Sequence, residues 1–308
     1  MKWVVRVISA IGVLVVSWCA LTAWPAIVHG HPLYGVLLLL TLLVAVVAGW
    51  WTFRGRAPWR GWRRVVAVIL VVLALGWLAL MAWLRPFTAV EPALAAMSSD
   101  SVVTVAESTS EIVMTPSGDV SPVGVFFQPG AKVEARAYAA VLRPLAEAGH
   151  TVVIAKQPLG IAFLSLGAFE SARDANPQIA SWVVGGHSLG GTVAAMEAEA
   201  HDSDAMAPVT GLMLYASYPA SDMSTSLVSD VISISGTNDG LATPADIDAS
   251  RGDLPAGAAF LPIDGAVHAF FGDYGPQPGD GTPTITHDAA RDQISGASVD
   301  FAERLSAP

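Results

Sequence analysis

The sequence predicts an α/β protein, with about eight strands in a mostly parallel sheet and helices on both faces, preceded by three membrane-spanning helices. Two observations predict this organisation. The chain has 308 residues, of which 53% are hydrophobic and 14% charged; it is too apolar for an ordinary soluble protein, and the excess lies in its first third. Beyond residue 100, short β-branched runs alternate with helical stretches, as they do in parallel sheets.

The charged residues divide the chain at the same place. All 26 acidic residues lie from Glu91 onward, whereas eight of the 16 lysines and arginines lie at or before Arg85. The first segment therefore carries a formal charge of +8, and the rest, with eight basic and 26 acidic residues, carries −18. Such an acidic segment argues against nucleic acid as a partner. The only cysteine, Cys19, lies in the apolar segment, which excludes a disulfide framework and a zinc cluster.

Three apolar runs without charged residues, 7–24, 33–51 and 65–84, are long enough to cross a bilayer, which takes about 20 residues. They contain few polar groups, so we interpret residues 1–85 as an anchor rather than a transporter. Nine of the ten tryptophans lie in this part of the chain, as expected near membrane interfaces. An alternative, in which the first run is a cleaved signal peptide, is disfavoured by its length and by the lack of a clear cleavage site.

The loop between the second and third runs predicts the orientation of the anchor. Short loops rich in arginine stay in the cytoplasm, so the N-terminus is expected there and the chain after the third run outside it. The first loop, by contrast, contains no lysine or arginine. The arginines of the second loop are Arg54, Arg56, Arg60, Arg63 and Arg64.

Residues 86–100 are predicted to form a short tether, and residues 101–308 a single domain with one core. The first two expected strands form an antiparallel hairpin, and a helix kinked at Pro144 follows the third strand. An irregular helical stretch reaches residue 176. The expected strands are 102–105, 111–115, 123–127, 151–155, 181–185, 211–215, 231–235 and 259–263, and the main helices are 134–148, 189–200 and 287–305.

The pattern G-x-S-x-G, from Gly186 to Gly190, stands between a predicted buried strand and a predicted helix. A sharp turn at this point exposes the serine hydroxyl at the end of the strand, and side chains two residues either side would collide. Ser188 is therefore a candidate nucleophile at a nucleophile elbow. Taken alone, the pattern also fits an ordinary glycine-rich turn.

Two partners complete a candidate catalytic triad. A serine becomes a nucleophile when a histidine takes its proton and a carboxylate stabilises the imidazolium. Asp239 follows the strand 231–235, and His268 follows the strand 259–263, so both are expected at the same sheet edge as Ser188. Asp239 in a plain Asn-Asp-Gly turn and His268 as a core histidine are the alternatives.

An oxyanion hole needs two backbone donors beside the nucleophile. Leu189, the residue after the serine, is expected to supply one. Ala131, in the turn after the third strand, is expected to supply the other, with Gly130 allowing the backbone to come close. The alternative is a simple Pro-Gly turn.

Residues 120–300 resemble the α/β-hydrolase superfamily, and within it the dienelactone-hydrolase-like branch called alpha/beta hydrolase fold-5. A further stretch, 271–281, is also similar to that branch, either with an undefined role or as a rigid loop that holds His268. True dienelactone hydrolases carry a cysteine where this chain has Ser188. The resemblance is carried by Gln128–Val133 with Tyr138, Gly186–Gly191, Gly236–Gly240 and Gly265–His268.

The candidate triad and the resemblance together imply a serine hydrolase outside the membrane. It would cleave an ester or a related acyl bond of a small-molecule or lipid-like substrate, without a metal ion or an organic cofactor. Two alternatives stay open: acyl transfer to an acceptor at the cell envelope, and a catalytically silent binding domain that keeps the fold. The sequence defines neither the acyl chain length nor the oligomeric state.

Overall fold

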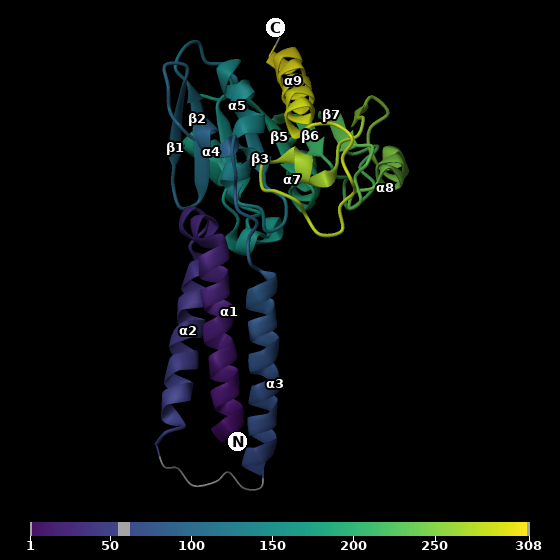
Figure 1. Cartoon of the computed structure of the whole chain (residues 1–308). Coiled ribbons are helices and arrows are strands. Elements are labelled where there is room, and N and C mark those ends of the chain that lie inside the picture. Colours follow the sequence, from purple (N-terminus) through teal and green to yellow (C-terminus); the bar gives the residue numbers. More distant parts are fainter. Residues whose placement is uncertain (1, 55–61, 307–308) are drawn as a thin grey trace. The chain divides into compact units, whose positions relative to one another are not determined.

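The computed structural model of the chain describes residues 2–54 and 62–306 and, within them, no side chains at positions 63 and 64. The chain divides into two compact units, Met1–Pro86 and Phe87–Pro308, which we describe separately. Figure 1 labels most of the elements of both. Most of the loop that is expected to be cytoplasmic, including Arg56 and Arg60, falls among residues 55–61, which lie outside the described residues.

In the described part of the first unit, three helices are long and apolar enough to cross a membrane. They are α1 (Lys2–His29), α2 (Leu33–Trp51) and α3 (Trp62–Trp83), each within a few residues of the expected runs except that α1 extends further at both ends. The helices pack closely, since a Cβ atom on Gly12 of α1 would lie 3.1 Å from the Cβ of Ala45 on α2. The Tyr34 hydroxyl of α2 donates a hydrogen bond of 2.8 Å to the Met81 carbonyl of α3.

The second unit is built on an eight-stranded sheet of described residues with the order β1-β2-β4-β3-β5-β6-β7-β8. β1 and β2 form the expected antiparallel hairpin, β2 is antiparallel to β4, and the other pairs are parallel. The predicted fold class is therefore confirmed. The strands are β1 (Val103–Glu107), β2 (Glu111–Pro116), β3 (Val123–Gln128), β4 (Val152–Ala155), β5 (Ser181–His187), β6 (Val209–Tyr215), β7 (Asp230–Gly236) and β8 (Ala259–Ile263).

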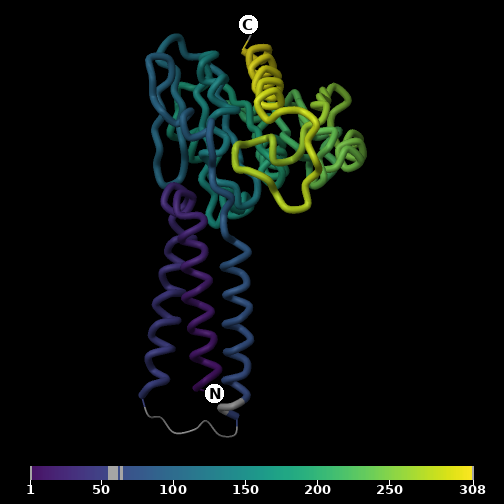
Figure 2. Tube along the Cα trace, in the orientation of Figure 1, coloured from purple at the N-terminus to yellow at the C-terminus, as the bar shows by residue number. Residues whose placement is uncertain are grey.

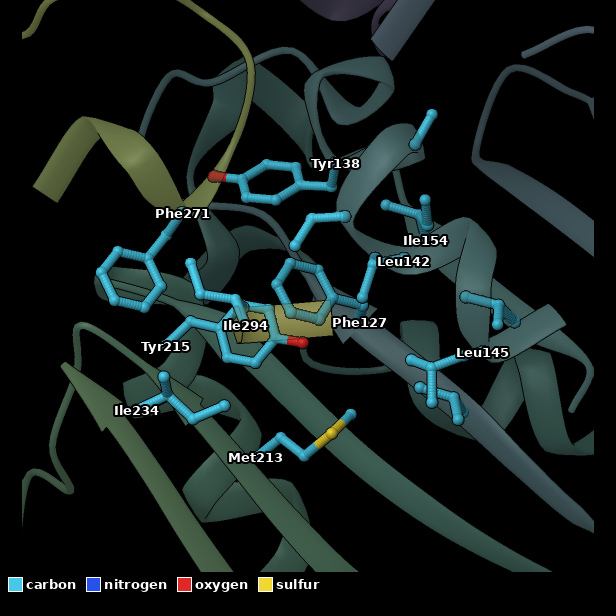
Figure 3. Close-up of a cluster of buried hydrophobic side chains, with 14 of the residues drawn as sticks. Phe127, Tyr138, Leu142, Leu145, Ile154, Met213, Tyr215, Ile234, Phe271 and Ile294 are labelled. Carbon is cyan, nitrogen blue, oxygen red and sulfur yellow. The ribbon is translucent and has the colours of Figure 1, made fainter. Parts of the chain in front are cut away.

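Helices cover both faces of this sheet. Side chains of α5 (Ala139–Glu147) and α9 (His287–Ser306) belong to the core on one face, and those of α6 (Ala168–Ala175) and α7 (Leu189–His201) to the core on the other. β3 is buried along its whole length, so its alternate residues enter both cores. Figure 3 shows Phe127 from this strand among aromatic and aliphatic side chains, with its ring 5.0 Å from that of Tyr138.

One helical stretch differs from expectation, and another agrees with it. The helix expected over residues 134–148 is divided, because a 3-10 turn (Ala135–Tyr138) precedes α5, and Pro144 lies inside α5. The irregular stretch before residue 176 consists of two 3-10 turns, Pro158–Gly160 and Ala162–Leu164, followed by α6.

The stretch expected to be a tether, 86–100, is for the most part ordered against the sheet. The unit boundary falls after Pro86, and Phe87 already forms a parallel bridge with Val133. A short helix, α4 (Ala93–Ala96), follows, and Ala93 is fully buried. This difference arises because the stretch contains small apolar side chains among residues of mixed composition. Such side chains can pack against the core without giving the sequence a clear helical or strand periodicity.

Candidate active site

The turn that carries Ser188 has the backbone conformation that the sequence pattern predicts. Ser188 joins β5 to α7 with φ 52° and ψ −125°, in a region that residues with side chains seldom adopt. A Cβ atom on Gly186 would lie 2.4 Å from the backbone of Gly190, and one on Gly190 would lie 2.1 Å from the carbonyl oxygen of Gln128. Both glycines are therefore required by close contacts of the backbone.

Asp239 and His268 are brought together at the edge where β7 and β8 end. The distance between Asp239 Oδ2 and His268 Nδ1 is 2.8 Å, and both side chains are buried. The other carboxylate oxygen, Oδ1, accepts the amide protons of Leu241 at 2.7 Å and Ala242 at 2.8 Å. These bonds fix the carboxylate and leave Nε2 of His268 as the ring nitrogen free to act on a hydroxyl.

Ser188 lies at the same edge, but no hydrogen bond joins its hydroxyl to His268 in the described chain. The ring of His187, the residue before Ser188, lies 4.5 Å from the ring of His268. Hydrogen bonds of catalytic groups are commonly long in unliganded enzymes and tighten when substrate binds. The structure thus pairs Asp239 with His268 at the sheet edge where the turn of Ser188 also lies.

The two expected oxyanion donors both have free amides. Among the described residues, neither the N–H of Leu189 nor that of Ala131 donates a hydrogen bond. The amides on either side of Ala131 are held in place: that of Gly130 donates to the Tyr138 hydroxyl at 2.8 Å, and that of Lys132 to the Gly160 carbonyl at 2.7 Å. An anion near Ser188 would meet two unpaired donors on a fixed backbone.

Sequence reasoning did not assign a role to the pair formed by Tyr138 and His187. The Tyr138 hydroxyl accepts the Gly130 amide proton and lies 2.8 Å from His187 Nδ1. One of these two groups donates to the other, and either tautomer of a neutral His187 ring satisfies the contact. Burial, and then the nearby His268, lower the pKa of His187 well below its usual range. His187 therefore adds no second positive charge beside His268.

Asp280 is a second group that the sequence did not identify. It lies in the long loop between β8 and α9, visible in Figure 2 as part of the yellow tube that precedes the final helix. Its carboxylate accepts the amide protons of His268 at 3.0 Å, Ala269 at 2.8 Å and Gly240 at 3.2 Å. One side chain thus connects the loop of the base with the loop of the acid, which gives the stretch 271–281 a holding role.

A buried polar network lies beneath the loop that carries Ala131. Gln128 donates a hydrogen bond to Glu197 of α7 at 2.8 Å, and Gln157 donates to Gln128 and to the Pro129 carbonyl, both at 2.9 Å. Oε2 of Glu197 has no partner among the described residues. Burial raises the pKa of Glu197 to about 8, so its carboxyl group is neutral at pH 7.

Comparison with known proteins agrees with this architecture. Residues 124–292 match the sequence model of a family described as the alpha/beta hydrolase family. A dienelactone hydrolase from Anabaena variabilis is similar in structure, with a TM-score of 0.50 and 16% identity over 66% of this chain and 98% of that one. An esterase domain from Rhodothermus marinus has a TM-score of 0.50 and 12% identity over 63% and 92%. Such identities show the fold alone, and no curated protein matches in sequence.

The Glu197→Gln variant should show how this buried acid affects stability. Between pH 4.5 and 8 the unfolded carboxyl group is ionised while the folded one keeps its proton, so the free energy of unfolding of the wild type falls as pH rises. Glutamine does not ionise, so this part of the fall should disappear. Thermal unfolding of the full chain in detergent across this pH range measures the effect.

The matched control is Glu303→Gln, at an exposed position of α9. It should keep the pH dependence of the wild type. An equally steep fall in Glu197→Gln and in the wild type would contradict the neutral state of Glu197.

Proposed function

Because the chain belongs to the alpha/beta hydrolase family, we propose that it is a serine hydrolase that cleaves an ester or related acyl bond. The observation that carries this proposal is the bonded pair of Asp239 and His268 at the sheet edge where Ser188 occupies a strained turn. The free amides of Leu189 and Ala131 beside that turn support it further. A binding domain without catalysis has no need to keep two unpaired donors and an oriented histidine together.

In the proposed mechanism, His268 acts first as a base and then as an acid. Its Nε2 takes the Ser188 proton as the hydroxyl oxygen attacks the substrate carbonyl, and Asp239 stabilises the imidazolium. The amides of Leu189 and Ala131 donate to the oxyanion that forms. The imidazolium then protonates the leaving alcohol, and water releases the acyl group from Ser188 by the same two steps.

We also propose that α1, α2 and α3 cross a membrane, with the N-terminus in the cytoplasm and the hydrolase unit outside. The length and apolar composition of the three helices support a membrane location. The arginine-rich loop before α3, together with the absence of lysine and arginine from the loop before α2, supports the orientation.

A fluorophosphonate probe should label wild-type protein at Ser188 and fail to label Ser188→Ala. Asp239→Asn should label at least about a thousandfold more slowly, because the carboxylate no longer holds the imidazole in its productive tautomer. In-gel fluorescence of the full chain in detergent measures the rates, with Ser221→Ala at an exposed serine as the control. Folded wild-type protein that resists labelling would overturn the proposed function.

Product analysis with added alcohol distinguishes hydrolysis from acyl transfer.

Asp280→Ala should lower kcat by about tenfold to a hundredfold with little change in KM, because the base and acid loops lose their common acceptor. The pH dependence of kcat should also shift, since the contact between Asp239 and His268 would loosen. Steady-state kinetics on a soluble short-chain ester measures both. Asp222→Ala, at an exposed loop position, is the control, and unchanged kinetics in Asp280→Ala would contradict the holding role.

Protease added to intact cells that express the full chain should remove the part of the protein after Arg85, because that part is expected outside. Immunoblotting against tags at the two ends measures the outcome. The N-terminal tag should be cleaved only after the cells are permeabilised. A fully protected C-terminal unit in intact cells would show that the proposed orientation is wrong.

A further inference from the structure

The second unit begins beside its own candidate oxyanion donor. The amide of Phe87 donates to the Lys132 carbonyl at 2.8 Å, and the amide of Glu134 donates to the Phe87 carbonyl at 3.0 Å. These bonds fix Phe87 along the segment that directly follows Ala131, at the end of β3. The chain therefore enters the hydrolase unit at the carboxyl edge of the sheet, where Ser188 also lies.

The length of the connection limits how far this edge can be from α3. The helix ends at Trp83, and only Leu84, Arg85 and Pro86 precede Phe87. Four steps of extended chain span at most about 14 Å. If α3 crosses a membrane, as proposed above, Phe87 and the segment after Ala131 to which it is bonded are held within about that distance of the end of the span.

The loop that follows β4 also lies at the carboxyl edge of the sheet, beside the segment to which Phe87 is bonded. We call residues 158–166 the apolar loop. Its Gly160 carbonyl accepts the Lys132 amide proton at 2.7 Å, so the apolar loop touches the segment to which Phe87 is bound. The whole stretch 158–169 contains no charged residue. The loop nevertheless exposes large side chains: Phe163 is 42% exposed, Leu164 53% and Leu166 48%.

Exposed apolar residues at the opposite edge of the sheet provide a contrast. Met206 precedes β6 and stands between two alanines, and Val228 precedes β7 and stands between the buried Leu227 and Ser229. Isolated exposed apolar residues are ordinary on protein surfaces. Three large exposed apolar side chains in an uncharged segment mark an interaction surface. The apolar loop lies next to the point where the chain arrives from α3, and this position indicates that the partner surface is the membrane.

We propose that the apolar loop lies in the headgroup region of the membrane and that the substrate is a lipid-soluble ester taken from the bilayer. This inference rests on the proposed hydrolase function and on the proposed membrane anchor. The charge of the unit limits which part can make this contact, because an anionic lipid surface repels a segment with a net charge of −18. An uncharged loop beside the site is the part of that surface that meets lipid headgroups at the least electrostatic cost.

A depth measurement on the full chain tests the lipid contact. Cys19 is the only cysteine, so Cys19→Ser provides a background in which Phe163→Cys carries a single environment-sensitive dye. Nanodiscs of phosphatidylcholine are prepared with and without a lipid that has a nitroxide at its headgroup. The nitroxide should quench the dye at position 163 at least about threefold more strongly than the dye of the control Met206→Cys, which lies at the far edge. Equal quenching at the two positions would overturn the proposal.

An activity ratio tests the substrate class. The double variant Leu164→Ser with Leu166→Ser should lower the turnover of a long-chain ester embedded in nanodiscs, relative to that of a soluble short-chain ester, by about tenfold. The control with Met206→Ser and Val228→Ser should keep the ratio of the wild type. An unchanged ratio in the double variant would overturn the lipid-phase substrate.

Labelling of Ser188 by the fluorophosphonate probe on the same samples distinguishes a failure of the hydrolase proposal from a failure of the proposed lipid contact. Labelled protein with an unquenched loop would retain the hydrolase and overturn the lipid contact. Unlabelled protein with a quenched loop would overturn the hydrolase and, with it, the substrate class, while it supports the contact of the loop with the membrane.

Discussion

The candidate site depends on the close approach of two backbone segments, the turn at Ser188 and the loop after β3. The position of Gly190 allows this approach, since a Cβ atom there would lie 2.1 Å from the carbonyl oxygen of Gln128. Because α7 begins against that loop, the free amides of Leu189 and Ala131 come from segments that touch each other. Gly130 meets the same constraint from the other side, where a Cβ atom would lie 2.6 Å from His187 Nδ1. Every later element of the site is arranged around this contact.

The polar groups around that contact are arranged so that few of them carry charge. His187, which contacts the Tyr138 hydroxyl, is kept neutral by burial, and burial also keeps Glu197 protonated at pH 7. In the proposed mechanism, the ion pair that would form during proton transfer is then confined to Asp239 and His268. An additional buried charge nearby would change the pKa of the base by direct interaction through a medium of low dielectric constant. The neutral neighbours therefore protect the function of the base as well as the stability of the fold.

Sequence reasoning could predict the elements that follow a local rule. Ser188, Asp239 and His268 each follow a strand, and parallel strands bring their ends to one edge, so their common location could be predicted from the order of strands alone. Asp280 could not be found in this way, because it contacts Gly240 across 40 positions of sequence and no spacing encodes that contact. The packing of residues 87–97 was missed for a related reason. Small apolar residues such as Ala93 are buried by residues distant in sequence, and their spacing in the sequence shows no hydrophobic periodicity.

The path of these residues also bears on where α3 is joined to the second unit. β1 is antiparallel to β2, which is antiparallel to β4, so β1 runs in the same direction as β4 and starts at the amino edge of the sheet. The chain that enters at Phe87 must therefore travel from the carboxyl edge to the amino edge before β1 begins. A direct connection from α3 to β1 would be shorter and would anchor the unit equally well, but the amino edge would then be the one tethered. The longer path has one evident consequence, which is that the tether is attached to the segment next to Ala131.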